Sequence, residues 1–186
     1  MNIIEAIYTR RAVRAFTAEP VDEATLRQLI DAAIQAPSAV NQQPWSFCVV
    51  RDPALLARIS SEAKAHLVKA APAVLSPHHL ELLSDAKFDI FYHAPALILI
   101  GAATESPWAV VDCALAAENL MLAARAARLG TCWIGFAQAW LGTPEGKAAL
   151  NLPAAYVPVA PIIVGHPRSE PPPVSRKEPE IHWIGG

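Results

Sequence analysis

The chain has 186 residues, of which 53% are hydrophobic and 17% are charged, and its formal net charge at pH 7 is −2. A chain of this length forms one domain with a substantial core, and the small negative charge argues against nucleic acid or an anionic membrane surface as partners. The high apolar content favours an obligate homodimer that buries part of its exterior, although alanine raises the hydrophobic count without making a sticky surface.

The first third of the chain is predicted to hold three helices and one strand. Apolar side chains recur at helical spacing in three segments, and β-branched and aromatic residues run together in a fourth. We expect helices over 2–9, 22–36 and 53–65 and a strand over 46–50. The first of these helices carries Ile3, Ile4, Ile7 and Tyr8 on one face.

The middle of the chain, over 66–93, has the poorest pattern. It contains prolines and the adjacent His78 and His79, and we expect one or two short helices with loops. Adjacent histidines on a helix point in different directions and no acidic residue is usefully spaced, so we expect no metal site there. A continuous apolar run predicts a strand buried on both faces over 96–102.

The longest predicted element is a central helix over 108–129, a stretch without Gly or Pro that is rich in Ala and Leu. Ser106 is expected to cap it, Pro107 suits the first turn, and Gly130 is expected to end it in a left-handed conformation. The helix is apolar nearly all round, which predicts burial in the core. The charged residues within it argue against a membrane span.

The last part of the chain is predicted to hold two more strands, a short helix and an arm. We expect the strands over 131–136 and 157–164 and the helix over 143–150. Prolines inside the second strand indicate an edge strand or a bulge. The Pro-rich, charged residues 166–186 predict an extended arm outside a domain formed by residues 1–165. The order of elements indicates an α+β fold with a mixed sheet flanked by helices.

Several classes of site are missing from the sequence. No GxGxxG, P-loop, HExxH or GxSxG motif is present. Cys48, Cys113 and Cys132 lie in apolar runs without metal-ligand spacing, which indicates reduced thiols and a cytoplasmic protein. The N-terminus lacks the pattern of a signal peptide.

Two polar features are candidates for a binding site. Arg10, Arg11 and Arg14 follow the first helix and could clamp a phosphate, since guanidinium groups bind phosphate in a bidentate manner. The alternative is a solvated, charged helix end. The segment APSAVNQQPW offers Ser38, Asn41, Gln42 and Gln43 in a short turn between prolines, where they could form hydrogen bonds to a flat heterocycle. The alternative is an ordinary helix-to-strand loop.

Five motifs, in this order, resemble the nitroreductase family: RRAVRAF, APSAVNQQPWSFCVV, FDIFYHAPALILIG, DCALAAENLMLAARAARLGTCWIGF and PPPVSRKEPEI. Together they span nearly the whole chain. The resemblance implies a homodimeric α+β fold that binds FMN at the subunit interface. It also implies that the C-terminal arm over 166–186 is exchanged between subunits and packs on the partner.

The resemblance also implies roles for individual residues. The FMN phosphate and ribityl chain would be held by Arg10, Arg11 and Arg14 together with Arg176 and Lys177. The loop with Pro37, Ser38 and Asn41 would meet the flavin from the second subunit, and the backbone amides of Trp133, Ile134 and Gly135 would face flavin N5 and O4. Ala12 stands where the family usually has Ser, and the lost hydroxyl contact costs about 1–3 kcal/mol unless other groups replace it.

The expected function is an FMN-dependent oxidoreductase that transfers hydride from NAD(P)H through flavin N5 to a small organic acceptor in a ping-pong cycle. Nitroaromatics, quinones and enones are candidate acceptors. The flavin performs the chemistry, so no catalytic side chain and no metal are expected. The variable region over 64–93 would supply the wall of the substrate pocket. Two alternatives remain open: other redox chemistry on the same fold, such as dehalogenation or flavin destruction, and a non-enzymatic flavin-binding dimer.

Overall fold

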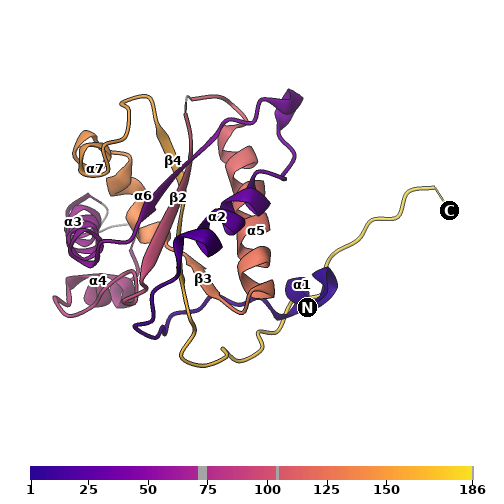
Figure 1. Ribbon diagram of the computed structural model, residues 1–186, viewed down its shortest axis with the longest axis horizontal. Helices are drawn as coiled ribbons and strands as arrows, with labels where there is room; N and C mark the ends of the chain where they lie inside the picture. The colour runs from indigo at the N-terminus through magenta and orange to yellow at the C-terminus, as the bar shows by residue number, and fades with distance from the viewer. Residues whose placement is uncertain (71–74, 104, 186) are drawn as a thin grey trace.

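The computed structural model describes residues 1–70, 75–103 and 105–185. In chain order its elements are α1 (Ile3–Thr9), α2 (Glu23–Ala33), a 3₁₀ turn (Ala39–Asn41), β1 (Trp45–Val50), α3 (Pro53–Ala70), α4 (Pro77–Ser84), β2 (Ala96–Ala102), α5 (Ala109–Ala126), β3 (Gly130–Trp133), α6 (Gly135–Leu141), α7 (Pro144–Ala149) and β4 (Val157–Gly165). A four-stranded sheet stands between α2 and α5 on one face and α3, α4 and α6 on the other (Figure 1). This confirms the α+β class and the flanking helices.

The strand order is β1-β2-β4-β3, and each pair of neighbouring strands is antiparallel. The sheet is mixed only through an isolated parallel bridge between Ala12 and Thr131. Because β4 lies between β2 and β3, the edge-strand explanation of its prolines is wrong. The bulge is present, since the register of β4 shifts opposite Ile100 and Gly101. A bulge lets a central strand tolerate a residue that cannot donate a ladder hydrogen bond.

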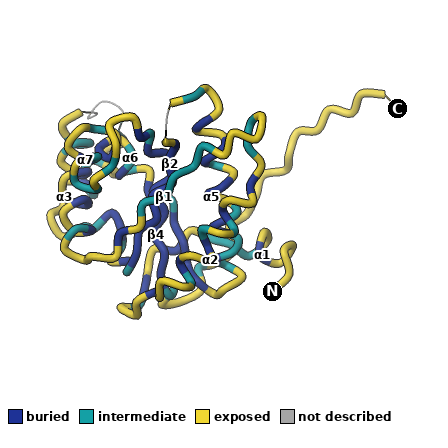
Figure 2. The backbone as a smooth tube through the Cα atoms, turned by 45° about the horizontal axis from the view of Figure 1, so that its top comes forward, coloured by how far each residue is buried: buried dark blue, intermediate teal, exposed yellow. Residues whose placement is uncertain are grey.

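Alternating side chains of β2 divide the hydrophobic core into two layers. Ile98 and Ile100 pack with α2 and α5, whereas Leu97 and Leu99 pack with α3, α4 and α6. Both sets are fully buried, as expected for a strand covered on both faces. Figure 2 shows the sheet as the buried centre of the molecule. The second of these layers includes Cys132, Ile134 and Ala137, which anchors β3, the edge strand of the sheet, and the start of α6.

The long helix α5 is confirmed, but its predicted ends are wrong. Trp108 occupies the N-cap without a side-chain cap bond, and the buried Ser106 hydroxyl has no recorded partner. The left-handed residue is Arg128, with φ 61°, and Gly130 instead begins β3. A Cβ on Gly130 would lie 2.8 Å from the Val13 side chain, so glycine is required there by close packing. None of the described helices is long and apolar enough to span a bilayer.

The other elements follow the sequence with shifted ends. The helix expected over 53–65 continues to Ala70, and α4 forms within the irregular region, while residues 71–74, which include Pro72, lie outside the described part. The strand expected over 131–136 stops at Trp133, and Gly135 starts helix α6. The apolar run therefore spans a strand and a helix, which periodicity over so few residues does not separate.

The C-terminal arm is extended, as predicted, and its first residues pack on their own domain. The Arg168 N–H donates to Ala15 O at 2.9 Å, and Glu170 pairs with Arg125 at 2.7 Å. Beyond Pro171 every described residue is exposed, and the arm projects away from the domain (Figures 1 and 2). Gly186 lies outside the described residues.

Candidate functional site

The arginines after α1 do not converge on one point. The Arg10 guanidinium forms an ion pair with Glu118 at 3.5 Å, and the Arg11 guanidinium donates to the carbonyl oxygens of Tyr8 and Arg10. Only Arg14 turns into the cavities beside β3. In one chain, therefore, Arg14 is the member of the predicted clamp that lines these cavities, whereas Arg10 and Arg11 line a separate, smaller pocket.

Arg14 lines a cavity of about 320 Å³ together with the strand-to-helix junction 132–136. Trp133, Ile134 and Gly135, all predicted from the sequence, form one wall of this cavity, and Ile90 and Tyr92 complete it. Parallel pairing of the segment before Arg14 with β3 produces this meeting, since the Val13 N–H donates to Thr131 O at 2.9 Å. Tertiary structure thus brings together two segments that the sequence analysis predicted to be in the site, the one that contains Arg14 and the one that contains Trp133, Ile134 and Gly135.

The backbone of the junction has open space at Gly135, one of the residues that line the cavity. The Ile134 N–H is already used, because it donates to Pro161 O at 2.8 Å. Gly135 follows as the first residue of α6, where N–H groups have no partner within the helix. Apart from its two chain neighbours and the backbone of its own helix, no atom lies within 4 Å of the position that a Gly135 Cβ would take, so a flat ligand can approach the backbone closely. Gly135, rather than Ile134, is the amide available to a ligand.

Tyr92 reaches the cavity from a strained turn. Tyr92 and His93 both have left-handed backbones, with φ 52° and 56°, which costs about 1–3 kcal/mol for each non-glycine residue. The Asp89 carboxylate holds the turn by accepting the N–H groups of Phe91 and His93 at 3.0 and 2.9 Å. Strain that the surrounding contacts enforce in this way is concentrated at functional sites.

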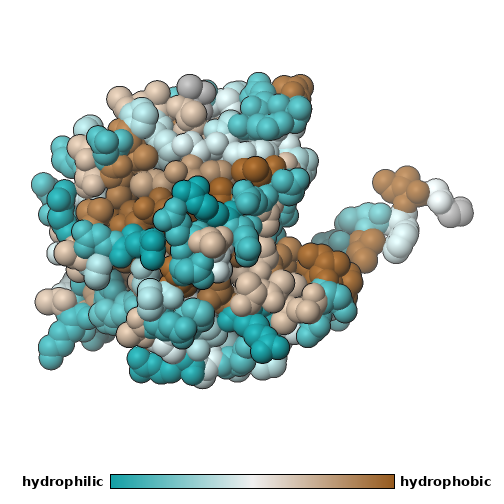
Figure 3. Space-filling model, in the orientation of Figure 1, coloured by the Kyte–Doolittle hydropathy of each residue, from teal (hydrophilic) through white to brown (hydrophobic). Residues whose placement is uncertain are grey.

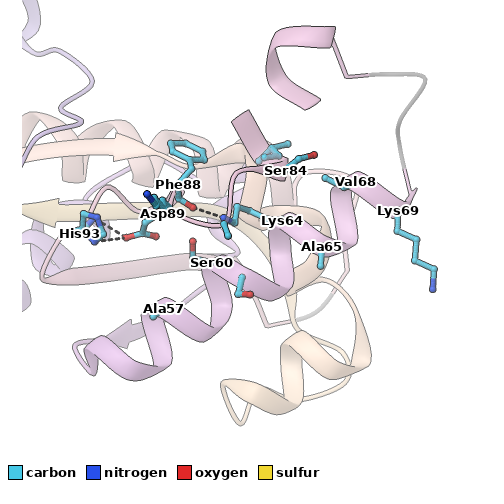
Figure 4. Close-up of a pocket in the computed structure, with 14 residues that line it drawn as sticks. Ala57, Ser60, Lys64, Ala65, Val68, Lys69, Ser84, Phe88, Asp89 and His93 are labelled. Atoms are coloured by element: carbon cyan, nitrogen blue, oxygen red, sulfur yellow. Dashed lines mark hydrogen bonds and ion pairs between the residues drawn. The ribbon is translucent and has the colours of Figure 1, made fainter. Parts of the chain in front are cut away.

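Buried polar groups of α3 hold the same turn from below. The Lys64 ammonium, which is 8% exposed, donates to Asp85 O at 2.8 Å and to Phe88 O. The Ser60 hydroxyl accepts the Ile90 N–H at 3.1 Å. These side chains line a larger cavity of about 720 Å³ between α3 and the turn, and Figure 4 shows Lys64 directed at the turn. Lys64 is thereby explained as a structural cation that satisfies carbonyl groups.

A second, positively charged cavity of about 280 Å³ adjoins the first. Arg14 and Tyr92 line both cavities and so form their shared wall. Lys87 and Arg168 also line the second cavity, with Asp89 as its acidic residue. We call the two cavities together the Arg14 cleft. Its charge suits an anionic group at one end, and its open backbone at Gly135 suits a flat group at the other.

The predicted loop with Pro37, Ser38 and Asn41 lies near the start of α5, whereas β3 follows the end of that helix. The Ala39 N–H donates to the buried Asp112 carboxylate at 3.0 Å, and the Ser38 hydroxyl accepts the Gln43 N–H at 2.9 Å. Between Asp112 and the end of α5, the helix rises by about 20 Å. The loop therefore does not line the Arg14 cleft of its own chain.

The loop has its own strained conformation. Val40, Asn41 and Gln43 all have positive φ, and Val40 is 88% exposed. A left-handed β-branched residue is unusual and requires support from its surroundings. Asp112 provides that support through the hydrogen bond that it accepts from the Ala39 N–H, while its other carboxylate oxygen is buried with no recorded partner. The loop is thus fixed on the surface of this chain with its side chains directed outward.

Arg176 and Lys177 are exposed on the arm, and no hydrogen bond or ion pair to either is recorded within the described residues. Ala12 is also exposed, at the bridge to Thr131. No cluster of possible metal ligands occurs in the part of the chain that the structure describes. All of the cysteines are free thiols. Burial raises the pKa of the Cys132 thiol in the cleft, and the Arg14 charge offsets part of that rise.

Several cleft residues were not identified from the sequence. Ile90, Tyr92, Cys132 and Phe136 all line the cavity with Arg14. Tyr92 and Ile90 lie in the motif FDIFYHAPALILIG, so the motif itself was a signal, but no spacing rule shows which side chains turn inward. Sequence reasoning identified the segment and left its residues unassigned.

Comparison with known proteins relates the whole chain to one group. A family model described as Nitroreductase family matches residues 7–166. The chain is 31% identical to a protein of Rhodospirillum rubrum named 5,6-dimethylbenzimidazole synthase, over 95% of this chain and 84% of that protein. It is 29% identical to a Bacillus subtilis protein named FMN reductase (NAD(P)H), over 97% and 70%. A nitroreductase crystal structure from Bacteroides fragilis with bound FMN superposes with a TM-score of 0.82 at 26% identity, covering 100% of this chain and 98% of that one.

Proposed function

The chain belongs to the nitroreductase family, and from this premise we propose that it is an NAD(P)H-dependent FMN oxidoreductase with FMN bound in the Arg14 cleft. The observation that carries the proposal is the meeting of Arg14 with the open backbone of Gly135 in one cavity. A phosphate requires cationic donors, and a flavin ring requires close access to a backbone N–H. The cleft offers both.

FMN held in the cleft would supply the hydride chemistry between NAD(P)H and a small organic acceptor. The chain's own residues bind and orient. Arg14 would hold the phosphate, the Gly135 N–H would donate to the ring edge, and Trp133 and Phe136, which line the cavity, would provide apolar walls. The acceptor, a nitroaromatic, a quinone or an enone, takes up a hydride and protons, and because solvent can supply the protons, no side-chain acid or base is required.

We further propose that the protein is a homodimer. The apolar residues of α1 face outward, with Ile3, Ile4 and Tyr8 between 59% and 74% exposed. Hydrophobic residues gather around α1 and the start of the arm, and again on the arm itself (Figure 3). Exposed apolar surface of this kind marks an interaction site. On α5 the exposed apolar residues are Trp108, Val110, Val111 and Leu115.

A dimer also accounts for the predicted site residues that lie outside the Arg14 cleft. The loop with Pro37, Ser38 and Asn41 is held by the bond to Asp112 and lies away from the cleft of its own chain, and Arg176 is on the part of the arm over 172–185, where every described residue is exposed. In the proposed dimer the loop of one subunit meets the flavin of the other. The arm packs on the partner subunit and brings Arg176 and Lys177 to the phosphate.

The test is the absorption spectrum of the purified protein before and after anaerobic addition of NADH or NADPH. We expect a flavin spectrum that loses its visible band with one or both nucleotides. A protein that is colourless and does not bind added FMN would refute the proposal. A flavin that neither nucleotide reduces would indicate a binding protein instead.

A second candidate is other flavin redox chemistry on the same fold, favoured by the similarity to the protein named 5,6-dimethylbenzimidazole synthase. Its signature is bound flavin that is reduced while no nitroaromatic, quinone or enone reoxidises it. The cytoplasmic location remains a prediction supported by the free thiols.

A further inference from the structure

The cavity of about 720 Å³ between α3 and the turn that precedes β2 is not used by the proposed flavin site. We call it the α3 cavity. Its volume lies in the range of small-molecule binding sites, which is about 300–1,000 Å³. It borders the second cavity of the Arg14 cleft along the turn, and four residues line both, Lys87, Phe88, Asp89 and His93. Ser60 and Lys64 line the α3 cavity and neither cavity of the cleft.

One face of α3 forms a wall of the α3 cavity. Its lining residues recur at the spacing of a single helix face and are Ala57, Ser60, Ser61, Lys64, Ala65, Val68 and Lys69. The polar ones lie together, because Ser60 and Lys64 are neighbours at a spacing of four residues. Leu83, Ala86 and Phe88 line the cavity from α4 and the turn. The cavity therefore combines apolar walls with one polar patch on α3.

Lys64 brings to this patch a buried positive charge that no carboxylate balances. The residue is 8% exposed, and its ammonium donates to the carbonyl oxygens of Asp85, at 2.8 Å, and of Phe88. An ammonium has three donors, so one remains without a recorded partner. None of the ion pairs in the described part of the chain includes Lys64. Because a buried charge is costly unless it is paired, an anion in the cavity would relieve this cost.

The acidic side chains of the turn are engaged elsewhere. The Asp89 carboxylate accepts two N–H groups of its own turn and pairs with the His93 ring at 3.3 Å (Figure 4). The Asp85 carboxylate accepts the Lys87 N–H at 2.9 Å. Among the described lining residues Asp89 is the one acid, and three are lysines, Lys64, Lys69 and Lys87. Lys69 points away from the turn in Figure 4, which leaves Lys64 as the buried cation of the cavity.

We propose that the α3 cavity binds a small organic acid, whose carboxylate pairs with Lys64 and whose apolar body lies against Leu83 and Phe88. The Ser60 hydroxyl accepts the Ile90 N–H at 3.1 Å, and no acceptor of its own O–H is recorded, so it is a second donor for the carboxylate. The volume and the apolar walls favour an organic acid over inorganic phosphate. The proposal does not depend on the flavin chemistry, because the site lies on the other side of the turn from Gly135 and Trp133.

The experiment is isothermal titration calorimetry of the purified full chain, with any bound flavin left in place. The probe is hydrocinnamate, a phenyl ring on a short chain that ends in a carboxylate. Hydrocinnamyl alcohol has nearly the same shape without the charge, and inorganic phosphate has charge without an apolar body. We expect hydrocinnamate to bind, the alcohol to bind about tenfold or more weakly, as for loss of a charge-assisted contact, and phosphate not to displace hydrocinnamate at equal concentration.

Two variants locate the bound acid in the α3 cavity. Lys64→Met keeps the length of the side chain and removes its charge, and we expect the affinity for hydrocinnamate to fall about 10- to 100-fold. Ser61→Asp, at an exposed position three residues before Lys64, places a competing carboxylate on the same face and should cause a loss of similar size. Arg58→Gln is the matched control, since it changes the net charge by the same amount at an exposed position of α3 outside the lining and should leave the affinity unchanged.

Thermal unfolding shows whether each variant is folded, and Ser61→Asp decides the question if Lys64→Met does not fold. Absence of hydrocinnamate binding overturns the proposal, and so does equal binding of the alcohol or of phosphate. An unchanged affinity in folded Lys64→Met or in Ser61→Asp also overturns it. Binding that shifts the visible spectrum of the flavin and that neither variant weakens places the acid at the flavin instead. Protein that lacks flavin and still binds hydrocinnamate would refute the proposed function and support this site.

Discussion

Replacing Asp112 by alanine tests how the outward-facing loop is supported. The Asp112 side chain is 2% exposed and accepts the Ala39 N–H at 3.0 Å. A hydrogen bond to a charged group contributes about 1.5–3 kcal/mol, and its loss also leaves the Ala39 N–H without its acceptor. We expect Asp112→Ala to lower the free energy of unfolding by that amount. For a domain of this size the melting temperature falls by about 3–12 °C.

The isosteric variant Asp112→Asn separates the hydrogen bond from other effects of the substitution. It retains an acceptor oxygen for Ala39 and replaces the unpartnered oxygen by an amide, so we expect a loss of about 1 kcal/mol. Asp31→Ala, at an exposed position on α2, should change stability by less than about 0.5 kcal/mol.

Thermal and urea unfolding measure these differences, and FMN titration measures their effect on the proposed site. Because the loop is proposed to meet the partner's flavin, Asp112→Ala should also weaken FMN binding more than Asp112→Asn does. Equal destabilisation by the two Asp112 variants would refute the reasoning, since it would show that the bond from Ala39 contributes nothing.

Three further predictions concern the arm, the missing hydroxyl and a buried thiol. Deleting residues 172–186 should give a protein that elutes as a monomer on size-exclusion chromatography and carries no FMN. The variant Arg176→Ala should remain dimeric and bind FMN more weakly, by about tenfold or more. A truncated protein that is still a flavin-bound dimer would contradict the arm's role. Ala12→Ser should tighten FMN binding, and unchanged affinity would place the phosphate away from residue 12. Burial, with a smaller effect of the neighbouring Asp112 charge, raises the pKa of Cys113 from 9.0 to about 11. The native state therefore keeps a proton that the unfolded chain loses, and stability should fall as pH rises from 9 to 11. Cys113→Ala should reduce that slope in urea titrations, and an unchanged slope would count against the buried thiol.

Local sequence was sufficient for most of the elements. Asp22 and Thr143 cap helices as their residue types favour, and β2 occupies the predicted range because a continuous apolar run that begins directly after Pro95 leaves little freedom. The ends of α5 were wrong for a tertiary reason. Gly130 is excluded from the helix end because close packing on Val13 requires it in β3, and Arg128 takes the left-handed conformation instead.

For the site, the sequence identified segments and the structure selected among their residues. Of the clustered arginines, only Arg14 lines the Arg14 cleft, because Arg10 is paired with Glu118 and Arg11 folds back on its own backbone. Of the backbone amides predicted to face the flavin, the Ile134 N–H already donates a hydrogen bond to Pro161 O within the fold. Such choices depend on contacts between residues far apart in the chain.

The sequence by itself determined the α+β class, the buried strands, the long central helix and the extended arm, because hydrophobic periodicity and turn chemistry act over a few neighbouring residues. Its ordered motifs also indicated the family. Only the tertiary structure decided that β4 is a central strand with a bulge and that the Ser38 loop faces away from the cleft of its own chain. It alone placed Tyr92 beside Arg14, because a strained turn held by Asp89 and Lys64 directs a side chain that no local pattern could orient.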